Sequence, residues 1–258
     1  MAYFTTTPIW ILGLTLVVLP TLVAMAAPPA IRRVMSLEML RTNNEVAGFK
    51  FAVVGVLYAV LLAFAVVVVW QNFSDSDSQV AEEAGAAATI YRLADGLDGT
   101  TAPQLRGALT QYLQVAVAED WPAMERGQGS VAATSALNDL YQAALRFSPS
   151  SNRDGVILGE VLHQLDLLTQ ARRDRLVSSS GIVPDLLWVI LFGGAILTVG
   201  FTFFFGTEHI LAQSGMTGIL TLLIFSGLLI IVVIDHPFAG SARVSPEAIT
   251  AVMDELGK

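Results

Sequence analysis

The sequence predicts an all-α membrane protein, with four transmembrane helices in two hairpins and a central antiparallel helical bundle domain. Four runs carry no charged side chain, over residues 1–31, 51–74, 186–207 and 210–234. Each run is long enough to cross about 30 Å of hydrocarbon, which takes roughly 20 apolar residues. Only 14% of the residues are charged, against about 25% in soluble proteins. We expect four segments: hairpins at 1–74 and 185–235, a bundle at 75–184, and a polar tail at 236–258.

The first hairpin is expected to hold helices over about residues 9–30 and 51–70. Pro20 and the pair Pro28-Pro29 predict a kink and a helix stop, because proline removes a helix hydrogen bond. The loop between the helices is short and cationic, with three arginines and Lys50 against two glutamates. The second helix ends in Trp70-Gln71-Asn72-Phe73, a set of aromatics and amides suited to the headgroup level.

Residues from about 78 to 176 show the apolar spacing of four packed helices. The first helix carries a stripe at alternating steps of four and three, formed by Val80, Ala84, Ala87, Tyr91 and Ala94. The second starts at Pro103 and stops near Trp121, the third ends before Pro149, and the fourth covers about 155–176. Turns rich in Gly, Ser and Pro favour an antiparallel bundle, continuous with the membrane helices.

The second hairpin is tight and begins at Pro184-Asp185, a helix-start pair. Its first helix carries Gly193-Gly194, small residues that let another helix approach closely. Its second helix ends at Asp235. The tail predicts one more helix over residues 245–256.

Composition and motifs exclude several function classes. Cysteine is absent, and no zinc-protease pair, phosphate loop, dinucleotide fingerprint or nucleophile elbow occurs. His163, His209 and His236 are far apart in the sequence, and we interpret them as surface or hydrogen-bonded residues. We therefore expect no catalytic residue, no metal and no cofactor. The net charge of −8 also makes a nucleic-acid partner a poor fit.

Two acid pairs and one group of arginines are candidate ion-binding residues, and each also has a simpler structural interpretation. Glu82-Glu83 and Glu119-Asp120 are capable of binding a cation, but adjacent helix positions point apart, so a solvated helix face is the simpler interpretation. The group Arg172, Arg173 and Arg175 precedes the third span. It could attract anions to a pore mouth, or pair with lipid headgroups or bundle acids.

Asp235 is an acid at the end of an uncharged run of 25 residues, a costly position unless the carboxylate reaches water or a partner. The simpler interpretation is a helix-end aspartate that fixes the turn at Pro237. The alternative is a role in gating or subunit contact.

A family resemblance follows from the second span. Gly55-Val56-Leu57-Tyr58 and Trp70-Gln71-Asn72-Phe73 resemble the second membrane helix of bestrophins. The chain as a whole resembles the bacterial bestrophin-like family of uncharacterised function. Matching residues include Asn44-Glu45 with Gly48, Tyr91-Arg92, Glu119-Asp120-Trp121-Pro122, Ala171-Arg172 with Arg175-Leu176, and Asp235 with Pro237-Phe238 and Gly240.

The resemblance implies a pentameric anion channel, because true bestrophins have that assembly, with four membrane helices per subunit and a cytosolic helical body. It implies a neck lined by the second span. The bestrophin Ile-Pro-x-x-Phe neck motif is absent, so we count the neck face from Gly55, which selects Ala52, Val56 and Val60. Further residues are assigned to helix contacts or structure: Gly55, Tyr58, Trp70, Asp235, Pro237 and Gly240.

Two functions are compatible with the sequence. The first is an oligomeric channel for small inorganic ions, gated by dewetting of an apolar neck. The second is a membrane-anchored helical assembly or sensor module that conducts nothing. For location, lysine and arginine counts near the spans do not fix the orientation. The resemblance implies a bacterial inner membrane, with the bundle in the cytoplasm.

Overall fold

The computed structural model describes residues 7–42, 44–97 and 99–256, and within these ranges all regular structure is helical. The chain divides into two compact units. One contains residues up to 71 together with 182–235, and the other contains 72–181 together with 236–258. The two hairpins that the sequence separates by the bundle therefore belong to one unit, which we call the membrane unit. The tail belongs with the bundle, and together they form the bundle unit.

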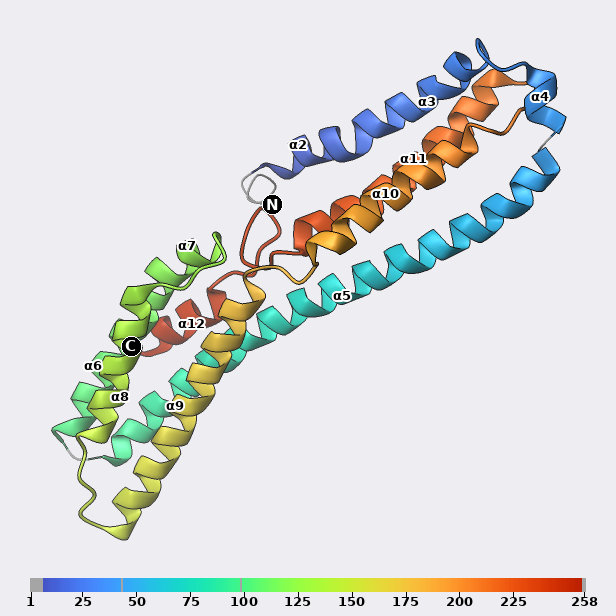
Figure 1. The fold of residues 1–258 in the computed structure, drawn as a ribbon. Coiled ribbons are helices and arrows are strands. Elements are labelled where there is room, and N and C mark those ends of the chain that lie inside the picture. The colour runs from blue at the N-terminus through green and yellow to red at the C-terminus, as the bar shows by residue number, and fades with distance from the viewer. Residues whose placement is uncertain (1–6, 43, 98, 257–258) are drawn as a thin grey trace. The chain divides into compact units, whose positions relative to one another are not determined.

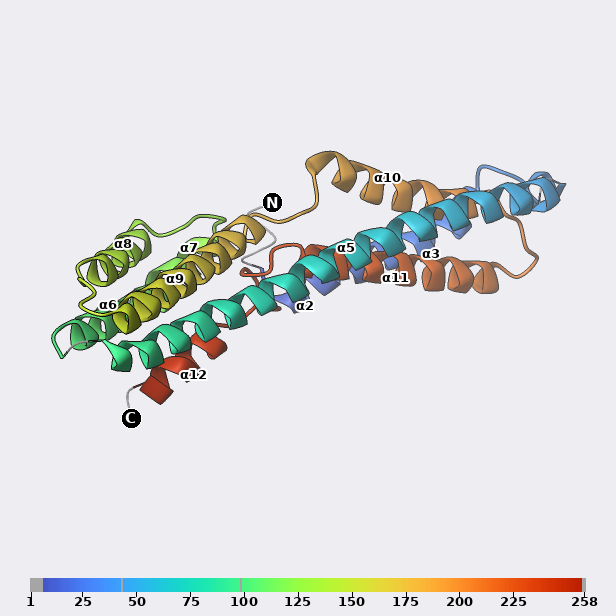
Figure 2. The same ribbon diagram turned by 90° about the horizontal axis from the view of Figure 1, so that it is seen from below.

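Four helices are long and apolar enough to cross a membrane, over Ile9–Ile31, Asn44–Gly96, Asp185–Thr202 and Ile210–Ile234. The apolar stretches of these helices coincide with the four charge-free runs of the sequence. The predicted spans are therefore confirmed as helices. The long member is α5, which runs without a break over Asn44–Leu93 (Figures 1 and 2). It supplies both the second span and the first helix of the bundle, as the predicted continuity required.

The first span consists of α2 (Ile9–Gly13), a π-helical segment η1 (Leu14–Val18) and α3 (Leu19–Ile31). The π-helical turn lies directly before Pro20, which has no N–H to give to the preceding turn. The helix then continues past Pro28 to Ile31, one residue beyond the expected range of about 9–30. The amide of Arg32 still bonds the Pro28 carbonyl at 3.1 Å.

The rest of the membrane unit is built from α4 (Leu37–Thr42), α10 (Asp185–Thr202) and α11 (Ile210–Ile234). Helix α11 lies along α3 (Figures 1 and 2). A glycine makes this approach possible, because a Cβ at Gly218 would lie 2.6 Å from Cγ of Met25. The packing uses small residues at the contact, as is common for helices in lipid.

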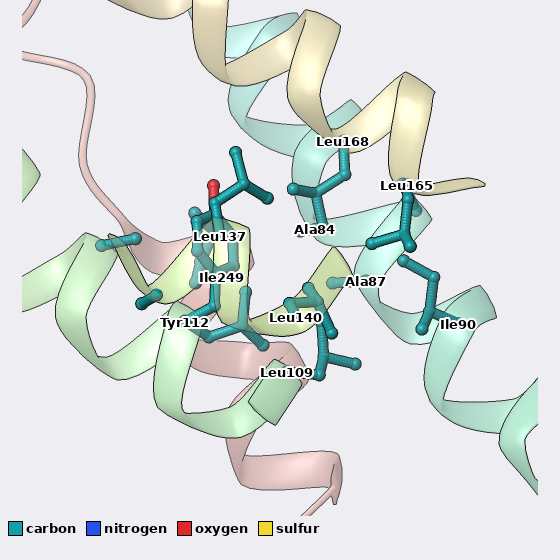
Figure 3. Packing of buried hydrophobic residues seen from close by; sticks show 14 of the residues in the cluster. Ala84, Ala87, Ile90, Leu109, Tyr112, Leu137, Leu140, Leu165, Leu168 and Ile249 are labelled. Atoms are coloured by element: carbon teal, nitrogen blue, oxygen red, sulfur yellow. The ribbon is translucent and has the colours of Figure 1, made fainter. Parts of the chain in front are cut away.

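The bundle unit packs the second half of α5 with α6 (Thr101–Val115), α8 (Val131–Leu145) and α9 (Asn152–Ser178). A π-helical segment, η3 (Ala116–Asp120), and the short α7 (Trp121–Met124) extend α6. The tail helix α12 (Glu247–Leu256) adds Ile249 to the core. Figure 3 shows side chains of this core from all five main helices: Ala84, Ala87, Ile90, Leu109, Tyr112, Leu137, Leu140, Leu165, Leu168 and Ile249.

Candidate functional site

The face of α5 predicted to line a neck is apolar and exposed in the single chain. Ala52, Val56 and Val60 recur every four residues, so they form one stripe along the helix. All three are exposed, with Val56 at 63% and Val60 at 50%. An exposed apolar stripe on a membrane helix meets lipid, another subunit or a dewetted pore. Because the stripe is exposed, it is available to contact lipid, another subunit or a pore. Its assignment to the pore neck stays a prediction.

The opposite face of α5 is anchored by Tyr58, which is buried. Its hydroxyl donates to the Leu191 carbonyl of α10 at 2.9 Å. The ring lies so close to α10 that a Cβ on Gly194 would be 2.6 Å from the ring carbons Cδ2 and Cε2. Tyr58 therefore makes a helix contact, and Gly194 is the partner that allows it.

Gly55 and Trp70 are the other two α5 residues that were assigned to structure or contacts. A Cβ on Gly55 would meet no atom of the described residues within 4 Å, so no other helix in that part of the chain approaches Gly55 closely. Trp70 is 60% exposed at the end of the second span. A contact of Gly55 with another subunit stays a prediction.

Asp235 is buried and acts within the chain. Its Oδ1 accepts the backbone N–H groups of Ile182 and Val183, at 3.1 and 3.0 Å. These two residues lie just before α10, so the carboxylate ties the start of α10 to the end of α11. The structural interpretation is favoured, because the carboxylate holds this loop; its part in fixing the Pro237 turn stays a prediction.

Groups of the bundle unit contribute to the Pro237 turn. The amide of Val244 donates to the Pro237 carbonyl at 2.7 Å. Gly240 has a φ of 79°, in the left-handed region that favours glycine. Phe238 is fully buried and meets Trp121 edge to face at 6.1 Å.

A network of buried charges links three elements of the bundle. Arg175 of α9 forms a two-point ion pair with Glu83 of α5, with Nε to Oε2 at 2.8 Å and Nη2 to Oε1 at 3.1 Å. Arg172 of α9 pairs in the same way with Asp120 of η3, at 2.7 and 3.1 Å. Arg175 also approaches Asp120 at 3.4 Å. We call these four residues the ion network; two positive and two negative charges make it neutral.

Neighbouring groups satisfy the rest of the ion network. The hydroxyl of Tyr112 donates to Glu83 at 2.5 Å, and the backbone amide of Ser130 donates to Asp120 at 2.8 Å. The Arg175 guanidinium lies 4.4 Å from the centre of the Trp121 ring, a cation–π contact. Such complete partnering is what buried charges require.

The ion network changes the ionisation of two groups. Burial raises the pKa of Tyr112 well above its ordinary value, and the negative charge of Glu83 raises it further. For Arg175, burial lowers the pKa, but the charges of Glu83 and other neighbours outweigh it and hold the pKa above its ordinary value. Tyr112 is therefore a neutral donor and Arg175 a permanent cation in the folded bundle.

This arrangement corrects the solvated-face interpretation of the acid pairs. Glu83 and Asp120 are completely buried, while their neighbours Glu82 and Glu119 are exposed. The sequence could have indicated which acid of each pair is buried. Glu83 lies four residues before Ala87 and Asp120 lies four residues after Ala116, so both acids fall on the apolar stripes of their helices.

The three arginines before the third span also separate into buried and exposed residues. Arg172 and Arg175 are buried in ion pairs, so they match the alternative of pairing with bundle acids rather than a charge open to a pore mouth. Arg173 is exposed, and a pore-mouth role stays a prediction for it alone. Leu165, Leu168, Arg172 and Arg175 follow at steps of three and four, which placed both buried arginines on the core stripe.

Within the described residues, no group of three or more His, Asp or Glu side chains is arranged to hold a metal ion. Of the histidines, His163 and His209 are exposed and His236 is half-buried.

Comparisons with known proteins identify a family for this all-helical chain with four apolar spans. A family model described as a bestrophin-like domain matches residues 17–249. No curated protein matches the chain.

Solved structures of a bacterial bestrophin homologue from Klebsiella pneumoniae share the fold. A leucine-to-threonine variant has a TM-score of 0.70 at 14% identity and covers 93% of this chain and 97% of that one. An isoleucine-to-threonine variant has a TM-score of 0.73 at 12% identity, with the same coverage. A form phased with zinc has a TM-score of 0.68 at 13% identity and covers 93% and 95%. The match over residues 17–249 and the shared fold establish that this membrane protein belongs to the bestrophin-like family.

Proposed function

We propose that this protein assembles with copies of itself into an ion channel whose neck is lined by α5. The observation that carries the proposal is the exposed apolar stripe of Ala52, Val56 and Val60, which lies opposite the anchored Tyr58. A helix fixed on one face and open on the other is suited to line a shared axis. The proposal assigns no catalytic residue.

Assembly is needed because two helical hairpins do not enclose an aqueous path by themselves. A closed ring of subunits around a rotation axis does so, with one α5 from each copy. The resemblance to bestrophins implies five copies, and it also implies anions as the conducted species. It further implies a bacterial inner membrane with the bundle in the cytoplasm.

In this channel, a ring of Val56 side chains, one from each subunit, controls conduction, because ions pass only when water fills the ring. A narrow apolar constriction excludes water, and ions cross only when it widens or becomes polar. The size and polarity of residue 56 are therefore expected to set the flux through the neck.

Flux from liposomes tests the proposal. Purified protein is reconstituted, and chloride efflux is compared for the native chain, Val56→Ala and Val56→Asp, with Leu57→Ala as the matched control. Leu57 is 68% exposed on the adjacent helix position, about 100° away around the helix. We expect both Val56 variants to change the flux severalfold and Leu57→Ala to leave it unchanged.

The competing function is a non-conducting, membrane-anchored assembly or sensor module. Flux equal to that of empty liposomes, across several salts and for every variant, would favour that module. The symmetry of the purified particle gives a separate test, because a ring with an axial hole is expected for a channel and a dimer contradicts it.

A further inference from the structure

One end of the membrane unit is closed by a polar clamp that is independent of the proposed neck. Three successive backbone carbonyls in the loop between α10 and α11 each accept a side-chain donor: Phe205 from Gln213, Gly206 from Asn44, and Thr207 from Arg32. Asn44 also accepts from the Gly206 amide at 3.0 Å. The end of α3, the start of α5 and the start of α11, which lie at the same end of the membrane unit (Figure 1), are thereby joined to one loop.

Arg32 brings an uncompensated charge to this clamp. Its Nη2 donates to the Thr207 carbonyl and, at 2.9 Å, to Oε1 of Gln213, and both acceptors are neutral. In the described part of the chain, Arg32 forms no ion pair with a carboxylate, whereas Arg41 nearby pairs with Glu208 at 2.8 Å. A half-buried cation with only neutral acceptors attracts an anion from outside the chain.

Two exposed cations lie in the chain segments that adjoin the clamp. Arg33 follows α3 and Lys50 lies in the first turns of α5. Both are exposed, and among the described residues neither forms an ion pair with a carboxylate. Each stands beside a strongly exposed apolar side chain, Val34 at 88% and Phe49 at 76%. Cations beside exposed apolar side chains are typical of segments that sit in the membrane interface.

The sequence positions set the depth of these cations. Arg32 and Arg33 follow directly on the charge-free run 1–31, and Lys50 directly precedes the run 51–74. A cation at the limit of a transmembrane run lies at the level of the lipid headgroups. The phosphate of a lipid is therefore the anion within reach.

We propose that three cations at one end of the membrane unit, Arg32, Arg33 and Lys50, bind the headgroup phosphates of anionic phospholipids. The fixed Arg32 positions the site, and Arg33 and Lys50 supply mobile charge around it. Val34 and Phe49 contact the acyl chains next to the headgroup. The site holds a lipid whether or not the protein conducts ions.

Native mass spectrometry of the purified full-length protein in neutral detergent tests the site. Phosphatidylglycerol and phosphatidylcholine are titrated against the native chain and the double variant Arg33→Gln, Lys50→Gln. The matched control is Arg146→Gln, Arg153→Gln, which removes the same charge from exposed positions of the bundle unit. We expect the native chain and the control to prefer phosphatidylglycerol, and the loop variant to lose about tenfold in its affinity.

Four outcomes would overturn the proposal. Equal affinity for both lipids would show that headgroup charge is not recognised. Equal losses in both double variants would mean that net charge alone is at work. Displacement of the lipid by millimolar inorganic phosphate would identify a free anion as the ligand, and a change in subunit number in the loop variant alone would identify a second copy as the occupant.

Discussion

The membrane unit and the bundle unit bury polar groups in opposite ways. The bundle holds two arginines and two acids in its core, each paired at hydrogen-bond distance. The membrane unit keeps its cations at the ends of its spans, and among its described residues the one buried acid, Asp235, accepts from backbone amides. Lipid offers no water to a charge that loses its partner, so a membrane span relies on neutral groups and close glycine contacts. The bundle tolerates buried ions because they come in matched pairs.

The ion network gives the largest expected effect. Arg175→Met leaves Glu83 without its cation in a dry core, so we expect a loss of about 3–5 kcal/mol in the free energy of unfolding. The double variant Glu83→Leu, Arg175→Met removes both charges and should lose much less. Denaturant unfolding of the full chain in detergent measures both. Equal losses in the single and double variants would show that the pair is not the source of the effect.

The buried acid of the membrane unit comes next. Asp235→Ala leaves the amides of Ile182 and Val183 without their acceptor, and we expect a loss of about 2–3 kcal/mol. Asp235→Asn keeps an oxygen acceptor and is the control, with a smaller loss expected. Thermal unfolding in detergent compares them. If Asn is as damaging as Ala, the charge itself is required, and a role beyond holding this loop follows.

The glycine contact tests the neutral packing of the membrane unit. Gly194→Ala places a Cβ 2.6 Å from the Tyr58 ring, and overpacking of this kind costs about 1–3 kcal/mol. Gly193→Ala is the control, because a Cβ there meets no atom within 4 Å. The melting temperature should fall only for Gly194→Ala. An equal fall in both would mean that helix flexibility, and not the ring contact, is affected.

Tyr112 gives the smallest effect near neutral pH and a distinctive one in alkali. Tyr112→Phe removes one hydrogen bond to a charged acceptor, and we expect a loss of about 1.5 kcal/mol. Because burial and Glu83 raise the pKa of Tyr112, its ionisation favours the unfolded chain. The advantage of the native chain over Tyr112→Phe should stay constant below pH 10 and shrink as the pH rises further. An unchanged difference above pH 10 would contradict the buried, neutral tyrosine.

Periodicity predicted the helices well because it reflects burial along one element. The charge-free runs located the four spans, and the steps of three and four located the bundle stripes. The same steps placed Glu83 and Asp120 on buried faces, but their adjacency to Glu82 and Glu119 suggested a solvated patch. Which acid met which arginine depended on the packing of α5, η3 and α9, and no sequence spacing encodes that. The clamp around Gly206 was missed for the same reason, since two of its donors, Arg32 and Asn44, lie far from the loop in the sequence.

The absence of cysteine gives the most direct test of the proposed neck. Single cysteines at residues 52, 56, 60 and 57 are made in the native chain, reconstituted in liposomes, and exposed to a charged, water-soluble thiol reagent during flux. We expect modification at 52, 56 and 60 to alter the flux, and modification at 57 to leave it unchanged. Flux that responds at 57 but not at 56 or 60, or that responds at none of the four, would contradict a neck lined by this face of α5.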